Sequence, residues 1–146
     1  MANCIQLIPA DPTAVPASDA ADQAVRLLWR YMPRAEDITV YASPTIRFFH
    51  PGENWTGVDC PACGKSADSW WDEARTDAIT TQVLTIKAPC CGAEISLNEM
   101  DFDSPSGFAR FVLEAANPRM DGLELNEIKE LEALLGLPLR QIYVQL

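Results

Sequence analysis

The segment CPACGKSADSWWDEARTDAITTQVLTIKAPCCG, residues 60–92, decides how the rest of the sequence is organised. It opens with CPACG (60–64) and closes with APCCG (88–92), so each end combines two cysteines with a proline and a glycine. Proline and glycine shape tight turns. We therefore expect residues 58–93 to form a small inserted module in a chain that is otherwise one domain, 1–146.

The thiols at the two ends of this segment have the spacing of a metal site. Cys60 and Cys63 are three positions apart on a turn where Gly64 permits the positive φ that lets backbone amides point at sulfur. Cys90 and Cys91 supply the second pair. Three alternatives are thiols that serve only as small apolar side chains, a redox Cys-x-x-Cys site, and iron in place of zinc. The proline and glycine around both pairs favour zinc.

With these residues the segment resembles the zinc-ribbon family, whose members hold Zn²⁺ between two such turns, or knuckles, at the tips of β-hairpins. The resemblance covers about residues 59–93. It implies a structural zinc ion with Cys60, Cys63 and Cys91 among its ligands. A closed site of four thiolates would contribute directly to folding.

The fourth ligand departs from the family pattern. That pattern would place a cysteine at position 88, where this chain has Ala88. The chain instead has a second cysteine directly before Cys91, at position 90. We expect two neighbouring cysteines to reach one metal only through a distorted turn. Either Cys90 takes the missing role, or His50 or Cys4 substitutes for it. We assign the zinc site to Cys60, Cys63, Cys90 and Cys91.

The remaining sequence predicts an α+β fold, with two helices on a mostly antiparallel sheet and a decorated ferredoxin-like arrangement as one form of it. Apolar residues at helical spacing predict a first helix that starts at Ser18, its N-cap, and stops at Pro33. They predict a second helix at 125–135, with Gly136 as its C-cap.

Alternating and β-branched residues predict the strands. We expect them at 3–9, 38–41, 45–49, 108–115 and 139–146, with 38–41 and 45–49 joined as a hairpin. Inside and after the module we expect a short helix at 69–78, a strand at 81–87 and an extended segment at 94–98. Trp70 and Trp71 cannot both face inward on that helix, so one should pack on the sheet and the other should be partly exposed.

Composition and charge limit the functional classes. The chain has 146 residues, of which 48% are hydrophobic and 22% charged, as in globular proteins, and its net charge is -10. Most of the excess acid follows residue 92. Such a charge repels nucleic acid and anionic lipid and suits a cationic partner. Because no signal peptide or membrane helix is evident, we expect a cytoplasmic protein without membrane contact.

We expect no catalytic and no cofactor-binding residues. We expect His50, the only histidine, to be structural or solvated. The sequence has no nucleophile elbow and no phosphate-binding loop. The predicted function is a non-enzymatic, zinc-stabilised protein-binding module, in its specific form an acidic bacterial immunity or inhibitor protein that meets a basic partner. The alternatives are a metal-dependent hydrolase with an open zinc site and a zinc-ribbon factor associated with nucleic acid.

Overall fold

The computed structural model describes residues 2–146, and within that range the chain contains both strands and helices. In order along the chain the elements are β1 (Asn3–Pro9), α1 (Ser18–Tyr31), β2 (Asp37–Phe49), β3 (Val58–Asp59), α2 (Asp68–Thr81), β4 (Thr85–Lys87), β5 (Glu94–Ser96), the 3-10 helix η1 (Leu97–Glu99), β6 (Asp101–Phe102), β7 (Gly107–Ala116), α3 (Leu125–Leu135) and β8 (Leu139–Gln145). The predicted α+β class is confirmed, with α2 as a third helix outside the main sheet.

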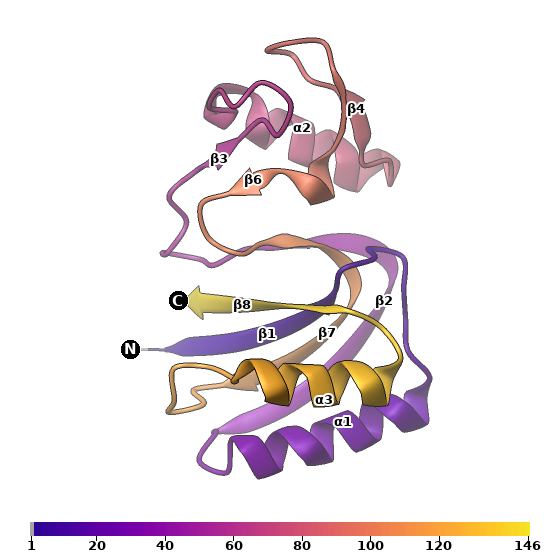
Figure 1. Cartoon of the computed structure of the whole chain (residues 1–146), viewed down its shortest axis with the longest axis vertical. Helices are drawn as coiled ribbons and strands as arrows, with labels where there is room; N and C mark the ends of the chain where they lie inside the picture. Colours follow the sequence, from indigo (N-terminus) through magenta and orange to yellow (C-terminus); the bar gives the residue numbers. More distant parts are fainter. Residues whose placement is uncertain (1) are drawn as a thin grey trace.

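The main sheet has the strand order β2-β7-β1-β8, and every neighbouring pair is antiparallel. Helices α1 and α3 lie side by side across one face of it (Figure 1). The core between them contains Leu7, Leu28, Phe111, Leu113 and Leu131. The mostly antiparallel sheet is thus confirmed. The order β-α-β-β-α-β agrees with the ferredoxin-like arrangement, which stays a prediction.

The two predicted helices form for the expected reason. In α1 the buried residues Ala21, Ala24 and Leu28 recur at spacings of three and four, which places them on one face. Helix α3 has the predicted bounds and ends at Gly136, whose φ of 74° is the left-handed conformation that glycine adopts readily. The predicted N-cap is wrong: Ala17 accepts the first helical hydrogen bond, so Ser18 already lies in the first turn.

The predicted hairpin at 38–49 is wrong, because β2 is a single strand. It pairs with β7 on both sides of a bulge, and the register shifts between Ala42 and Arg47. Proline has no backbone N–H to donate, and this is acceptable both in a turn and at a β-bulge. The sequence around Pro44 therefore does not distinguish the two. The side chain of Gln82 completes the bulge: Ile46 donates its N–H to Gln82 Oε1 over 2.6 Å, and Gln82 Nε2 donates to the Ile46 carbonyl over 3.1 Å.

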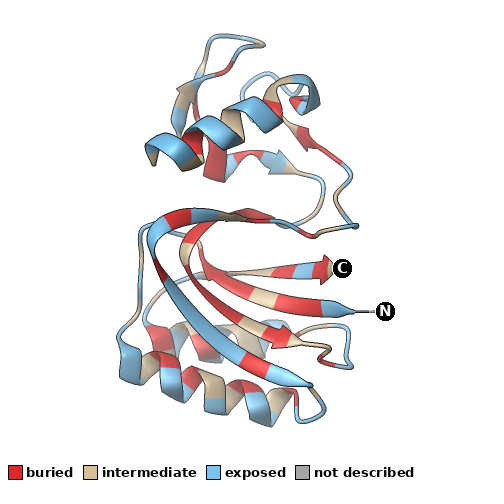
Figure 2. Cartoon of the chain, turned by 180° about the vertical axis from the view of Figure 1, so that it is seen from behind, coloured by how far each residue is buried: buried red, intermediate tan, exposed pale blue. Residues whose placement is uncertain are grey.

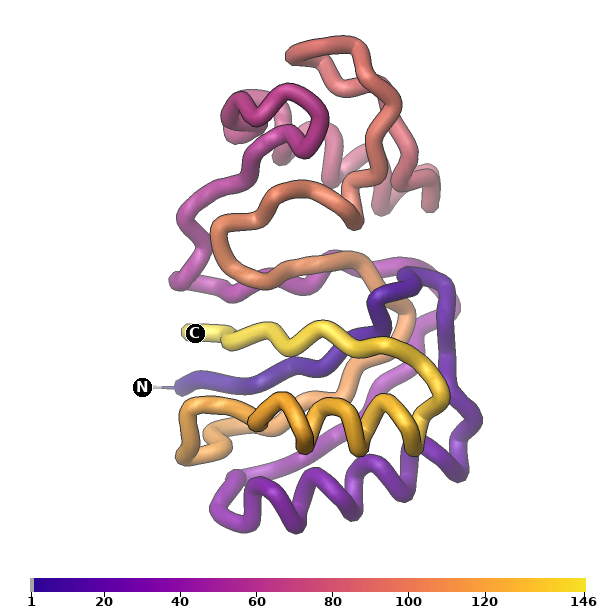
Figure 3. Tube along the Cα trace, viewed as in Figure 1, coloured from indigo at the N-terminus to yellow at the C-terminus, as the bar shows by residue number. Residues whose placement is uncertain are grey.

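Beyond the bulge, β2 and β7 curve across the face of the sheet opposite α1 and α3 (Figure 3). There the strand pair is covered on both sides. Phe49 and Ala109 pack with Ile8 of β1 and Ile142 of β8. The side chains that alternate with them, Phe48 and Phe108 among them, pack against a second layer.

The second layer consists of β3, α2, β4, β5, η1 and β6 (Figure 1). Its strands pair only as β3 with β6 and β4 with β5. Helix α2 is longer than the predicted 69–78 and ends at Gln82 in the left-handed region, so the predicted strand at 81–87 begins only at Thr85. The extended segment expected at 94–98 passes into η1 after Ser96.

Buried residues line the sheet and the helix faces turned toward it (Figure 2). A buried amide also joins the two layers. Asn98, which is 3% exposed, donates through Nδ2 to the Ala10 carbonyl, and its Oδ1 accepts the Phe108 N–H. Between residues 2 and 146, no helix combines the length and the apolar character needed to cross a membrane.

Candidate metal centre

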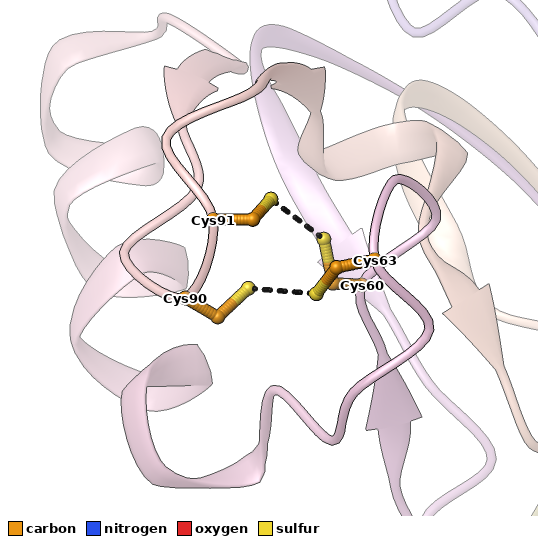
Figure 4. A group of neighbouring side chains, drawn as sticks. All are labelled: Cys60, Cys63, Cys90 and Cys91. Atoms are coloured by element: carbon orange, nitrogen blue, oxygen red, sulfur yellow. Dashed lines mark hydrogen bonds between the residues drawn. The ribbon is translucent and has the colours of Figure 1, made fainter.

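The sulfur atoms of Cys60, Cys63, Cys90 and Cys91 all lie within 4.8 Å of one another. Cys60 Sγ is 4.0 Å from Cys91 Sγ, and Cys63 Sγ is 3.4 Å from Cys90 Sγ (Figure 4). Four sulfurs around a zinc ion at 2.3 Å would be about 3.8 Å apart along each edge of the tetrahedron. The cysteines of the described chain form no disulfide. This cluster could therefore hold a metal ion.

The first cysteine turn follows β3 directly. Cys60 donates its N–H to the Lys65 carbonyl over 2.8 Å, and the Cys60 carbonyl accepts the N–H of Gly64 over 2.9 Å. Gly64 has a φ of 76°, which a residue with a Cβ adopts at a cost. Cys60 is buried and Cys63 is exposed, so the turn presents one sulfur from the core and one from the surface.

The second turn joins β4 to β5 and has the same hydrogen bonds. Ala88 donates to the Ala93 carbonyl over 2.8 Å and accepts the N–H of Gly92 over 2.7 Å, and Gly92 has a φ of 75°. Superposing the two patterns places Ala88 at the position of Cys60. Cys91 then corresponds to Cys63, and Cys90 to Ala62.

The turn is thus regular, and the expected distortion is wrong. In the first turn the thiol of Cys60 is on the first residue. In the second turn the first residue is the buried Ala88, and the fourth thiol of the cluster is on the third residue, Cys90. The two adjacent side chains reach different partners, since Cys90 Sγ lies beside Cys63 Sγ and Cys91 Sγ beside Cys60 Sγ (Figure 4).

Backbone amides and burial shift the pKa values of the thiols in opposite directions. Hydrogen bonds from the N–H groups of Cys63 and Ala62 lower the pKa of Cys60 to about 7. Burial raises the pKa of Cys90 to about 12, and hydrogen bonds with the neighbouring thiols act in the same direction. Without a cation, Cys60 is therefore partly ionised at pH 7, whereas Cys90 keeps its proton. A divalent cation would displace that proton.

The two candidate substitutes lie elsewhere. Cys4, on β1, has its Sγ 3.6 Å from Glu114 Oε1; burial, reinforced by that carboxylate, raises its pKa to about 12. His50 accepts the Gly52 N–H at Nδ1 over 3.1 Å and stacks on the Phe48 ring. Neither joins the sulfur cluster, and in the described part of the chain no carboxylate or imidazole does so.

Of the two adjacent tryptophans, one is buried and the other is partly exposed, as predicted. Trp71 is 3% exposed and packs edge-on against Phe48 and Phe108 of the main sheet. Trp70 is only partly buried and borders a groove between α2 and the second cysteine turn. We did not predict this groove, although residues 70, 74, 78 and 81 have the spacing of one helix face.

Comparison of the chain with family models, with curated proteins and with solved structures gives no match. No family match therefore supports the zinc-ribbon resemblance. Four converging sulfurs and the matching hydrogen bonds of their two turns indicate that this cluster could hold a metal ion.

We predict that Cys60→Ser lowers zinc affinity more than about 100-fold, beyond the usual effect of changing a residue that only orients a ligand. The hydroxyl is a poorer zinc donor than a thiolate. Zinc content and thermal unfolding measure the effect. Cys4→Ser is the matched control, because Cys4 is also buried but distant from the cluster, and it should keep its zinc. Full zinc content in Cys60→Ser would contradict the assignment.

The equivalence of the two turns generates a second prediction. Cys90→Ala should lose tight binding, and the double variant Ala88→Cys/Cys90→Ala should recover it to within about 10-fold, because the thiol returns to the place that Cys60 holds in the first turn. Titration with Co²⁺, followed through its thiolate absorption bands, compares the three proteins. A double variant that binds no better than Cys90→Ala would show that the turns are not equivalent.

Proposed function

We propose that the protein is a zinc-stabilised, non-catalytic module that binds another protein. The observation that carries the proposal is the composition of the cluster, in which four thiols lie together with no imidazole or carboxylate from the described residues. Catalytic zinc sites keep an open position for water, whereas four protein ligands close the coordination sphere. We assign the metal ligands to Cys60, Cys63, Cys90 and Cys91.

Zinc suits the second layer because little regular structure holds it together. The β3–β6 ladder pairs only Val58 and Asp59 with their partners, and the β4–β5 ladder extends over three residue pairs. Short ladders of this kind are weak without a cross-link or a metal. Thiolates select zinc over harder cations such as Mg²⁺ and Ca²⁺. A bound ion would join two turns that lie far apart in the sequence.

A metal-dependent hydrolase is less well supported. His50, the only imidazole in the chain, is outside the cluster, and burial together with the charge of Arg75 lowers its pKa below the usual range. It is therefore neutral at pH 7 and bonded at Nδ1 to the Gly52 backbone. Among residues 2–146, no imidazole or carboxylate joins the sulfur cluster to act as a general base on a bound water.

Binding to nucleic acid is also disfavoured by charge. Between Gly64 and Pro89 the cations are Lys65, Arg75 and Lys87, and Arg75 lies 3.5 Å from the carboxylate of Asp72. The net charge of -10 favours a cationic protein as the partner, as for an acidic immunity or inhibitor protein. A cytoplasmic location is part of this proposal, since reducing compartments keep thiols free for a metal.

We predict a closed metal site. Co²⁺-substituted protein should show the absorption of a tetrahedral four-thiolate complex, and addition of azide should leave the spectrum unchanged, because no exchangeable water is bound. Carbonic anhydrase loaded with Co²⁺ provides a positive control with an open position. A spectral change with azide in this protein would favour the hydrolase.

We also predict binding of peptides. A random peptide library displayed on phage is offered to the zinc-loaded protein and to protein stripped with a chelator, which should lose the shape of the second layer. Enrichment of sequences by the zinc-loaded form alone supports the proposed function. Absence of enrichment by that form would contradict it.

A further inference from the structure

The groove beside the second cysteine turn has the shape and composition of a peptide site. Its volume is ≈ 330 Å³, at the lower end for ligand sites and enough for one large side chain. Helix α2 forms one wall and the β4 hairpin the other. The apolar residues of the two walls are Trp70, Ala74, Ala78, Val83, Ile86 and Pro89.

Apolar side chains in this groove are in contact with solvent. Val83 is 55% exposed, although it is an aliphatic residue between a helix and a strand. Trp70 is only partly covered as well. Burial of such a surface against a partner is favourable at about 25 cal/mol per Å².

The charge at the groove has one sign. Glu73 and Asp77 line it from α2, and no lysine or arginine lines it. Both carboxylates are exposed, and neither takes part in a salt bridge within residues 2–146. A lysine or arginine of a partner would therefore find two free acceptors at the rim of an apolar site.

An unsatisfied donor lies in the same wall. The Nε1 atom of Trp70 is buried and has no hydrogen-bond partner among the described residues. A buried donor without a partner costs about 1–3 kcal/mol. A backbone carbonyl of a bound segment would provide the acceptor after a small rotation of the indole. This feature favours a peptide over a purely aliphatic ligand.

We propose that this groove binds a segment of a partner protein in which one large apolar side chain is flanked by lysine or arginine. The inference rests on the proposed function and deepens it by naming the surface and the chemistry of the partner. The apolar side chain would lie between Ala74 and Ile86, and the cation would pair with Glu73 or Asp77.

Peptides selected by the zinc-loaded protein provide the probe. We expect them to contain Leu, Ile, Phe or Met beside Lys or Arg. Fluorescence anisotropy of a labelled selected peptide then compares variants at low ionic strength. Glu73→Gln/Asp77→Asn should weaken binding about 3- to 10-fold, as expected when a cation of the peptide loses its exposed carboxylate partners. Ala74→Trp, which fills the groove, should weaken it further.

The matched control is Asp22→Asn/Glu53→Gln, which removes the same charges from exposed positions outside the groove. It should change the affinity less than 2-fold. The double amide variants are isosteric with the parent residues, and zinc content with circular dichroism verifies their folding.

The outcomes separate the two proposals. If selected peptides bind the parent and both groove variants equally, another surface binds them; the proposed function then stands and the groove assignment is overturned. Selection of acidic peptides would overturn it in the same way. If the zinc-loaded protein selects no peptide, the proposed function and the groove assignment both fail.

Discussion

The contact between Phe48 and Phe108 is the interaction on which the rest of the structure depends. These residues face each other across the β2–β7 ladder with their ring centroids 4.8 Å apart, and Trp71 and Phe102 pack on the Phe48 ring. The bulge in β2 is what turns this part of the ladder toward the second layer. Without that aromatic base, α2 and the two cysteine turns would have no surface on which to pack.

The same core extends outward to the sulfurs. Cys60 and Ala88, the first residues of the two turns, are both buried in the cluster that contains Trp71 and Phe108. The aromatic side chains therefore hold the inner part of the second layer, while its outer part ends in exposed Cys63 and Cys91. In the proposed function a metal ion fixes that outer part, where short ladders and exposed turns provide little stability.

Local patterns in the sequence predict those features whose causes are local. Helix α3 and its stop at Gly136 follow from periodicity and the conformational freedom of glycine, and the four thiols stand out by their spacing. The bulge in β2 has a distant cause, because the amide that completes it belongs to Gln82. The regular second turn was equally hidden, since the adjacent Cys90 and Cys91 suggested distortion until the hydrogen bonds of both turns could be compared.

The position of the groove links the proposed metal to the proposed partner. Pro89 lies in the second cysteine turn next to Cys90, and Ile86 is on the strand that leads into it. An ion that pulls this turn toward Cys60 and Cys63 also fixes the groove wall opposite α2. Preorganisation of a binding wall increases affinity, because less conformational freedom is lost on association. A closed metal site that performs no chemistry would thus still control binding, through the distance between the hairpin and the helix.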